Sequence, residues 1–451
     1  MKIILGLLLL ALVGFSCSAS TPSRPIISIP LFKSRTIQLS ALFNATLGIT
    51  ATQVHQIHTR HGSRRLATFL ARTQACSSPS VYSVSPLQNC HPGRGFRRAK
   101  HPPAPKVSGT TTQSIPLQIE ANDIGYYASF FLGTPLREYR LLVDSGSADM
   151  WVGGERCKGA DGGNCGNHKF LGPRSSSSYR ETEQPWYMTY GSGVVSGILV
   201  NDTVKLGILP PLRNFTFGVT EEESPQFTAD DIPFDGVLGC AKDSLSMQQT
   251  PTLLNALRNA GLISERIWSY KISRYSDGKN DGELTIGSMD TSKYKANSLV
   301  RVPNMSSAGF WEIELGSVTV NGQILNLGRR SCILDTGTTL LIAPKSDVAT
   351  IHDSIPGAKH DNSSNTWTVP CNTTASIALM IGNKSFPIQS EDLAFLPLEN
   401  STTMCTSAIA EGGVSEGRTH WLCGNTVLKN VYLSTNEDTD QISVARVGLA
   451  A

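Results

Sequence analysis

The chain has 451 residues and a formal net charge of +3, a near balance that hides two segments of opposite charge. Residues 20–119 carry twelve Lys and Arg and no Asp or Glu, whereas residues 120–451 carry 26 Lys and Arg against 36 Asp and Glu. The one long apolar run, residues 3–15, is too short to anchor the chain across a bilayer, and no second run approaches that length. These features exclude a helical membrane protein.

Residues 1–19 are predicted to be a secretory signal peptide. Lys2 precedes the apolar run, and small residues surround the expected cleavage point after Ala19. Eight Asn-X-Ser/Thr sequons agree with glycosylation on the secretory route, at Asn44, Asn201, Asn214, Asn304, Asn362, Asn372, Asn383 and Asn400. We therefore expect a secreted protein without a membrane anchor, and an acidic vacuole is the lesser alternative.

The basic segment that follows covers residues 20–107. A polycationic stretch is typical of nucleic-acid binding, but this one lies between a signal peptide and an acidic domain, so nucleic-acid binding is not expected. His55, His58 and His61 fall in this basic run and indicate a solvated face in preference to a metal site. No metal and no cofactor are predicted.

The most informative pattern is a pair of related triplets, Asp144-Ser-Gly146 and Asp335-Thr-Gly337, each preceded by apolar residues. Before each triplet lies an alternating strand pattern that turns at a Gly, over residues 127–135 and 311–320. After each comes an apolar-apolar-Gly sequence, at residues 237–239 and 422–424. One such triplet is an ordinary turn sequence, but the repeated order predicts two duplicated halves that each bring one carboxylate to a shared site.

Over most of residues 117–451 the sequence resembles the pepsin family of bilobal aspartic proteases, including secreted acid proteases of the fungal type. The resemblance also includes the segments 186–207, 234–239, 250–263 and 447–450. It implies an all-β dominated, bilobal pepsin-like fold, in which two lobes related by a pseudo-twofold enclose a cleft. We place the N-terminal lobe at residues 108–300 and the C-terminal lobe at residues 301–451.

The chemistry explains why two carboxylates are needed. Peptide hydrolysis without a metal or a covalent intermediate requires a base that activates water and an acid that protonates the carbonyl oxygen and then the amine. Asp144 and Asp335 are the expected catalytic pair, because two adjacent carboxyls share one proton and so hold both roles at once. The sequence does not assign that proton to either residue.

The resemblance implies roles for the surrounding residues. Ser147 and Thr338 are expected to hydrogen-bond the outer carboxylate oxygens, while Gly146 and Gly337 allow a close approach of the backbone and donate their N–H groups. Residues Tyr190, Gly191 and Ser192 form the tip of a flap over the substrate. Trp151 is expected to hydrogen-bond Tyr190. Ser192, two residues past Tyr190, is expected to help line the pocket for the side chain before the scissile bond, with Tyr190 and Phe227 as its apolar neighbours.

For the basic segment the resemblance implies a pro-segment that acts as an intramolecular inhibitor. A cationic arm over an acidic cleft is held at neutral pH, and the attraction fades as the carboxylates become protonated. Lys33 and Arg35, which follow the apolar residues 29–32, are expected to reach the active carboxylates. Residues 99–116 resemble a linker that is cut on activation.

Ten cysteines are present, and nine remain without Cys17. The resemblance implies two disulfides, Cys157 with Cys165 and Cys371 with Cys405. Cys76 and Cys90 are candidates for a pair within the pro-segment. The remaining three, Cys240, Cys332 and Cys423, are interpreted as buried small hydrophobic residues. Cys332 and Cys423 nevertheless lie on segments that neighbour each other in the family.

Asn425 departs from the family, which usually has Asp after the second apolar-apolar-Gly. The missing carboxylate is expected to affect the pH optimum, and it suggests an alternative in which the protein is a catalytically silent binding or inhibitor protein with a pepsin fold. The intact pair of triplets favours a secreted aspartic endopeptidase that is made as a zymogen. Its expected partners are protein and peptide substrates and its own pro-segment, and the protein is expected to be a monomer.

Overall fold

The computed structural model describes residues 113–121, 123–362, 366–398, 401–412 and 419–448. Strands dominate these residues, so the prediction of an all-β dominated fold is confirmed. The predicted signal peptide, the pro-segment with Lys33 and Arg35, and the pair Cys76 and Cys90 lie outside the described residues.

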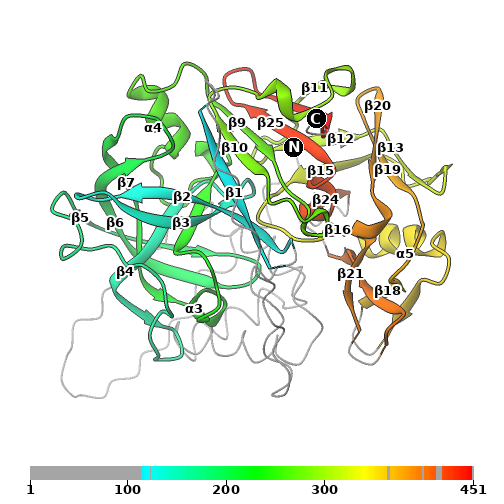
Figure 1. Cartoon of the computed structure of the whole chain (residues 1–451), viewed down its shortest axis with the longest axis horizontal. Coiled ribbons are helices and arrows are strands. Elements are labelled where there is room, and N and C mark those ends of the chain that lie inside the picture. Colours follow the sequence, from blue (N-terminus) through cyan, green and yellow to red (C-terminus); the bar gives the residue numbers. More distant parts are fainter. Residues whose placement is uncertain (1–112, 122, 363–365, 399–400, 413–418, 449–451) are drawn as a thin grey trace, which may run out of the picture. The chain divides into compact units, whose positions relative to one another are not determined.

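The largest sheet has thirteen strands and combines segments from both ends of the described chain (Figure 1). Its strands, in chain order, are β1 (Ser114–Glu120), β2 (Gly125–Leu132), β3 (Arg137–Asp144), β4 (Met150–Gly159), β5 (Arg180–Thr189), β6 (Val194–Lys205), β7 (Leu212–Glu223), β8 (Gly236–Gly239), β9 (Ile267–Lys271), β10 (Gly282–Ile286), β11 (Val300–Pro303), β25 (Val431–Asn436) and β26 (Gln441–Arg446).

Three smaller sheets are built from the second half of the chain. The first contains β12 (Glu312–Leu315), β15 (Arg330–Leu334), β16 (Leu341–Ala343), β23 (Ile409–Glu411) and β24 (His420–Cys423). The second contains β13 (Ser317–Val320), β14 (Gln323–Ile324), β19 (Ile377–Ile381) and β20 (Lys384–Ile388). The third contains β17 (Lys359–Asp361), β18 (Thr366–Pro370), β21 (Ala394–Pro397) and β22 (Met404–Ser407).

Helices are short. Within the described residues, the α-helices are α3 (Pro225–Thr228), α4 (Leu253–Asn259), α5 (Lys345–Asp353) and α6 (Asn425–Leu428), and the 3₁₀ turns are η1 (Asp243–Leu245), η2 (Tyr275–Asp277), η3 (Thr291–Lys293), η4 (Ala296–Ser298) and η5 (Ser390–Leu393). None of the helices in the described residues has the length and apolar character that crossing a bilayer requires.

The two triplets occupy matching strand arrangements. In the first half, β3 pairs in parallel with β8, and β8 pairs antiparallel with β4. In the second half, β15 pairs in parallel with β24, and β24 pairs antiparallel with β16. Each arrangement delivers an Asp at the carboxyl end of a buried strand, which is the duplication that the sequence predicts.

The two halves of the chain share strand pairings and core. β9 lies between β10 and β25, and β11 pairs with β26, so strands from the end of the chain complete a sheet that begins at β1. The boundary predicted between residues 300 and 301 falls inside β11. One continuous hydrophobic core includes residues of both parallel strand pairs at the triplets, Leu141 and Leu238 in the first and Cys332 and Cys423 in the second.

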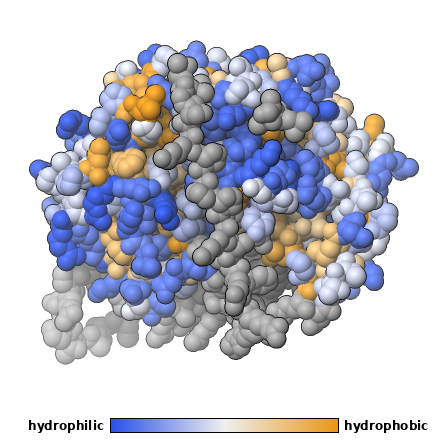
Figure 2. Space-filling view, viewed as in Figure 1, coloured by the Kyte–Doolittle hydropathy of each residue, from blue (hydrophilic) through white to orange (hydrophobic). Residues whose placement is uncertain are grey.

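Hydrophilic residues predominate on the face shown in Figure 2, and the hydrophobic residues there form separate patches between them. Among the described residues, seven large hydrophobic side chains are exposed: Phe131, Leu136, Tyr187, Ile208, Met305, Ile324 and Leu398. They come from strands and loops in both halves of the chain, as is common for isolated apolar residues on soluble proteins.

Candidate active site

The two triplets form matching hydrogen-bond networks around their carboxyls. Asp144 Oδ1 accepts from the Gly146 N–H at 2.8 Å, and its Oδ2 accepts from Ser147 Oγ at 2.5 Å. Asp335 Oδ1 accepts from the Gly337 N–H at 2.8 Å, and its Oδ2 accepts from Thr338 Oγ1 at 2.6 Å. The hydrogen-bond partners expected from the resemblance are therefore in place around both carboxyls.

The glycines at the third position of each triplet lie where the two carboxyls meet. A Cβ atom on Gly146 would lie 2.5 Å from Cγ of Asp335, and a Cβ atom on Gly337 would lie 2.4 Å from Oδ1 of Asp144. Real Cβ atoms do not approach other atoms so closely, so any other residue at either position would push the carboxyls apart.

Both carboxyls are buried, and they interact with each other. Burial, followed by the neighbouring charge of Asp335 and a hydrogen bond with it, raises the pKa of Asp144 well above its usual range. Ser147 and the Gly146 N–H oppose this rise, because they stabilise the ionised form. The pair can therefore retain one shared proton at a pH at which isolated carboxyls would both be ionised.

The middle residues of the triplets join the two loops, a role that sequence reasoning missed. Ser145 Oγ donates to the Leu334 carbonyl at 2.8 Å, and Thr336 Oγ1 donates to the Val143 carbonyl at 2.7 Å. Each hydroxyl oxygen also accepts from the backbone N–H of the other residue at 2.9 Å. The signal was present in the sequence, since both middle residues carry a hydroxyl group.

The predicted flap is the turn between β5 and β6. The Tyr190 N–H donates to the Gly193 carbonyl at 2.7 Å across a tip that contains Gly191 and Ser192. Trp151 Nε1 donates to the hydroxyl of Tyr190 at 2.7 Å. Burial and the nearby charge of Asp144 raise the pKa of Tyr190 well above its usual value, so this hydroxyl remains a neutral hydrogen-bonding group.

Phe227 on α3 supports the flap from behind. Its ring contacts Trp151 edge-on at a centroid distance of 5.4 Å, and it contacts Tyr190 at 5.5 Å. Ser192 is also buried, and its hydroxyl has no hydrogen-bond partner among the described residues. Trp151, Tyr190 and Phe227 thus pack together beneath a turn that contains Gly191 and Ser192.

Asn425 lies beside the second triplet, fully buried. Its backbone N–H donates to the Thr338 carbonyl at 2.8 Å, and its Nδ2 donates to the Ile124 carbonyl at 3.2 Å. The Ile124 carbonyl also accepts from Thr339 Oγ1 at 2.7 Å. Asn425 is therefore connected to the loop of Asp335 by its backbone hydrogen bond to Thr338. Its side chain has no hydrogen bond with the carboxyl of Asp144 or of Asp335 in the structure.

Three disulfides are present among the described residues. Cys157 is joined to Cys165 and Cys371 to Cys405, as the resemblance implies. The interpretation of Cys332 and Cys423 as unpaired hydrophobic residues is wrong, because the two are joined across β15 and β24. Cys240 is buried and unpaired in the described part of the chain.

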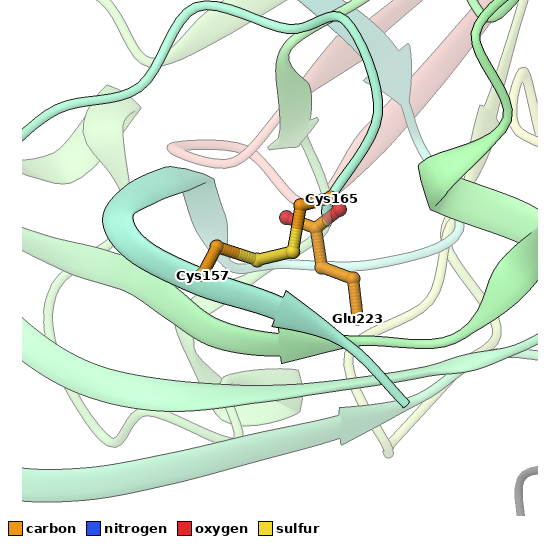
Figure 3. A group of neighbouring side chains, drawn as sticks. All are labelled: Cys157, Cys165 and Glu223. Atoms are coloured by element: carbon orange, nitrogen blue, oxygen red, sulfur yellow. A yellow bond between two sulfur atoms is a disulfide. The ribbon is translucent and has the colours of Figure 1, made fainter. Parts of the chain in front are cut away.

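Figure 3 shows a group of side chains with metal-ligand atom types, formed by Cys157, Cys165 and Glu223. Its two sulfurs are bonded to each other and are not available as thiolate ligands. The group is better described as a disulfide packed beside a buried carboxyl. Glu223 Oε1 accepts from Thr220 Oγ1 at 2.6 Å, and burial raises the pKa of Glu223 to about 8.

Comparison with known proteins agrees with this geometry. The family model described as eukaryotic aspartyl protease matches residues 125–447. The chain is 32% identical over 363 residues to a probable aspartic-type endopeptidase CTSD of Arthroderma benhamiae, a match that covers 79% of this chain and 67% of the relative. It is 33% identical to rhizopuspepsin-1 of Rhizopus niveus, covering 75% and 84% of the two chains. It is 30% identical to pepsin A of Rhinolophus ferrumequinum, covering 72% and 82%.

Proposed function

Because the chain belongs to the eukaryotic aspartyl protease family, we propose that it is an endopeptidase made as a zymogen, which hydrolyses peptide bonds between bulky hydrophobic residues at acidic pH. The observation that carries the proposal is the pair of buried, interacting carboxyls of Asp144 and Asp335 with matched hydrogen-bond donors. We further propose that the protein is secreted, acts as a monomer, and uses no cofactor.

In the proposed mechanism the carboxyl pair holds one proton and a water molecule. The ionised carboxyl takes a proton from the water as it attacks the peptide carbonyl, and the protonated carboxyl donates to the carbonyl oxygen. The proton taken from the water is then delivered to the leaving amine as the C–N bond breaks, and a hydroxyl of the intermediate returns its proton to the other carboxyl as the C=O bond forms again. Ser147, Thr338 and the two glycine N–H groups orient the carboxyls, and the Tyr190 hydroxyl completes the site from the flap.

One experiment tests the proposal as a whole. The purified precursor is incubated at falling pH while its mass and its activity on a denatured protein are followed. We expect a fall in mass together with the appearance of activity that a statine-type peptide inhibitor blocks. A correctly folded protein that binds the inhibitor but never cleaves substrate would instead support the alternative of a silent binding protein, which Asn425 suggests.

The flap residue Ser192 is expected to exclude lysine from the pocket before the scissile bond. A Lys ammonium buried there without a carboxylate would cost roughly several kcal/mol, whereas apolar side chains gain from burial against Tyr190 and Phe227. The wild type should therefore cleave between bulky hydrophobic residues, and Ser192→Asp should gain cleavage after Lys.

A peptide-library profile measures this preference. Ser192→Asn is the matched control, because it has almost the same size as Asp without the charge, and it should gain no cleavage after Lys. A wild-type profile dominated by Lys or Arg before the cut would overturn the assignment.

The pro-segment is expected to hold the precursor inactive near neutral pH by charge attraction. The precursor should convert on acidification, with cleavage between Arg98 and Ile115, because protonation of carboxylates weakens the attraction. Replacing Lys33 and Arg35 together by Gln should raise the activity of the uncut precursor at neutral pH.

The control for this variant replaces Arg64 and Arg65 by Gln, which removes the same charge elsewhere in the basic segment and should leave the precursor inactive. Intact mass and initial rates on a quenched peptide are measured for all three precursors. A wild-type precursor that is fully active at pH 7 with residues 20–98 attached would refute inhibition by the pro-segment.

A further inference from the structure

The disulfide between Cys332 and Cys423 lies directly behind Asp335. Cys332 is three residues before Asp335 on β15, and Cys423 is the last residue of β24. The Cys423 carbonyl accepts from the Asp335 backbone N–H at 3.1 Å. Both cysteines are fully buried. The disulfide therefore links β15, which is followed directly by Asp335, to β24, whose last residue accepts the hydrogen bond from the Asp335 backbone.

The first half of the chain contains the same arrangement without the disulfide. Leu141 pairs with Gly236 in the parallel ladder of β3 and β8, and Cys332 pairs with Trp421 in the ladder of β15 and β24. By this register, Leu141 and Leu238 are the counterparts of Cys332 and Cys423, and both leucines are fully buried. At equivalent positions, the strands that lead to Asp144 are joined by the packing of two leucines, and those that lead to Asp335 are joined by a disulfide.

The strand that carries Asp335 is shorter than its counterpart and lies in a smaller sheet, which explains where a covalent bond is useful. β15 has five residues against eight in β3, while β24 and its counterpart β8 have four each. β15 and β24 belong to a five-stranded sheet, and β3 and β8 to the thirteen-stranded one. No strand in the sheet of β15 exceeds five residues. A short ladder has few hydrogen bonds, and its ends separate at a lower cost in free energy than those of a long strand in a large sheet.

At their other end the same strands are tied by polar side chains. Ser331 Oγ on β15 donates to Glu312 Oε1 on β12 at 2.5 Å, and His420 Nδ1 on β24 lies 2.6 Å from the same oxygen. The disulfide joins the middle of β15 to the last residue of β24, and so adds a covalent link on the side of these polar contacts that faces Asp335.

We propose that Cys332 and Cys423 are positioning residues, whose disulfide fixes the carboxyl of Asp335 relative to that of Asp144. The inference rests on the proposed function, since it concerns the same carboxyl pair. It goes beyond stabilisation, because it assigns to this disulfide an effect on turnover that a disulfide remote from the site does not have.

The test compares two double variants with the wild type. C332L/C423L copies the leucine pair of the first half, and C332A/C423A removes the bond with smaller side chains. Displacing a catalytic group by about 1 Å costs up to about a hundredfold in rate, so we expect kcat to fall by about ten- to a hundredfold. We expect KM to stay within about twofold and the pH profile of kcat to change, because the spacing of the two carboxyls sets how they share a proton.

C371A/C405A is the matched control, since it removes the disulfide between β18 and β22, outside the carboxyl network. At a temperature at which near-UV circular dichroism shows all variants folded, it should keep wild-type kcat and pH profile. Wild-type kcat in either folded Cys332/Cys423 variant, or an equal loss of kcat in the control, would overturn the inference. An inactive wild type would instead refute the proposed function itself.

Two measurements on the wild type keep the inference testable if both variants fail to fold. Non-reducing peptide mapping must find Cys332 linked to Cys423, and any other linkage overturns the inference. The active enzyme is then titrated with a dithiol reductant, which becomes oxidised as it opens disulfides, and each opened pair is quantified by differential alkylation. Activity should fall in step with opening of Cys332–Cys423, and activity that survives this opening would contradict the inference.

Discussion

Replacing either Asp144 or Asp335 by Asn is expected to abolish peptidase activity. Asn is almost the same size as Asp, and its one side-chain oxygen can accept from the Gly146 or Gly337 N–H while its amide donates to the Ser147 or Thr338 hydroxyl, so the fold should survive. An amide cannot ionise, however, and the remaining carboxyl then lacks a partner with which to share a proton. Either variant therefore removes the singly protonated pair, which supplies both the general base and the general acid. We expect kcat/KM to fall on the order of 10⁴-fold.

The measurement is kcat/KM on a quenched peptide at acidic pH, with near-UV circular dichroism as the check on folding. Glu223→Gln serves as the control, because it removes another buried carboxyl without contacting the pair, and it should remain active at acidic pH. Hydrolysis by a clean preparation of either Asn variant at a rate near that of the wild type would refute the mechanism.

Raising the pH from 4.5 to 8 is expected to destabilise the protein through Glu223. Its side chain is buried, no ion pair reaches it within the described residues, and burial raises its pKa to about 8 despite a hydrogen bond from Thr220. The unfolded chain releases this proton near pH 4.5, whereas the folded protein retains it up to about pH 8. The contribution of protonated Glu223 to the free energy of unfolding is therefore fully present below pH 4.5 and is lost by about pH 8.

The size of this loss follows from linkage. Each pH unit between the two pKa values costs about 1.4 kcal/mol, which amounts to about 5 kcal/mol over the window. Glu223→Gln keeps the shape and the acceptor for Thr220 but cannot ionise. Its free energy of unfolding should match that of the wild type near pH 4.5 and exceed it increasingly up to about pH 8.

Urea unfolding at several pH values measures the effect, in an Asp335→Asn background that prevents self-digestion. Glu222→Gln, one residue earlier on β7 and half-buried, is the control for the loss of a carboxyl from the same strand. Parallel pH profiles for Glu223→Gln and its parent would show that Glu223 does not titrate in this window. The predicted direction agrees with a protein that works in acid.

The sequence predicts some of these features and conceals others for physical reasons. Asp144 and Asp335 can be paired because each lies in a repeated order of strand, turn and glycine. Glu223 gives no such signal, since it is the third of three consecutive Glu residues and only the register of β7 shows which of them points inward. The link between Cys332 and Cys423 depends on which strands become neighbours, and their separation of 91 residues carries no information about that.

The pairing of β9 with β25 has a consequence for synthesis on the ribosome. Ser269 on β9 hydrogen-bonds Ser434 on β25, and the two are 165 residues apart in the sequence. At roughly 5 to 20 residues per second, about 10 to 30 s pass between translation of the two strands. During that time the edge of β9 that pairs with β25 has no partner, and the large sheet is complete only after β25 has been translated. An unpaired strand edge can pair with another chain, so we expect the nascent chain to be prone to aggregation until then.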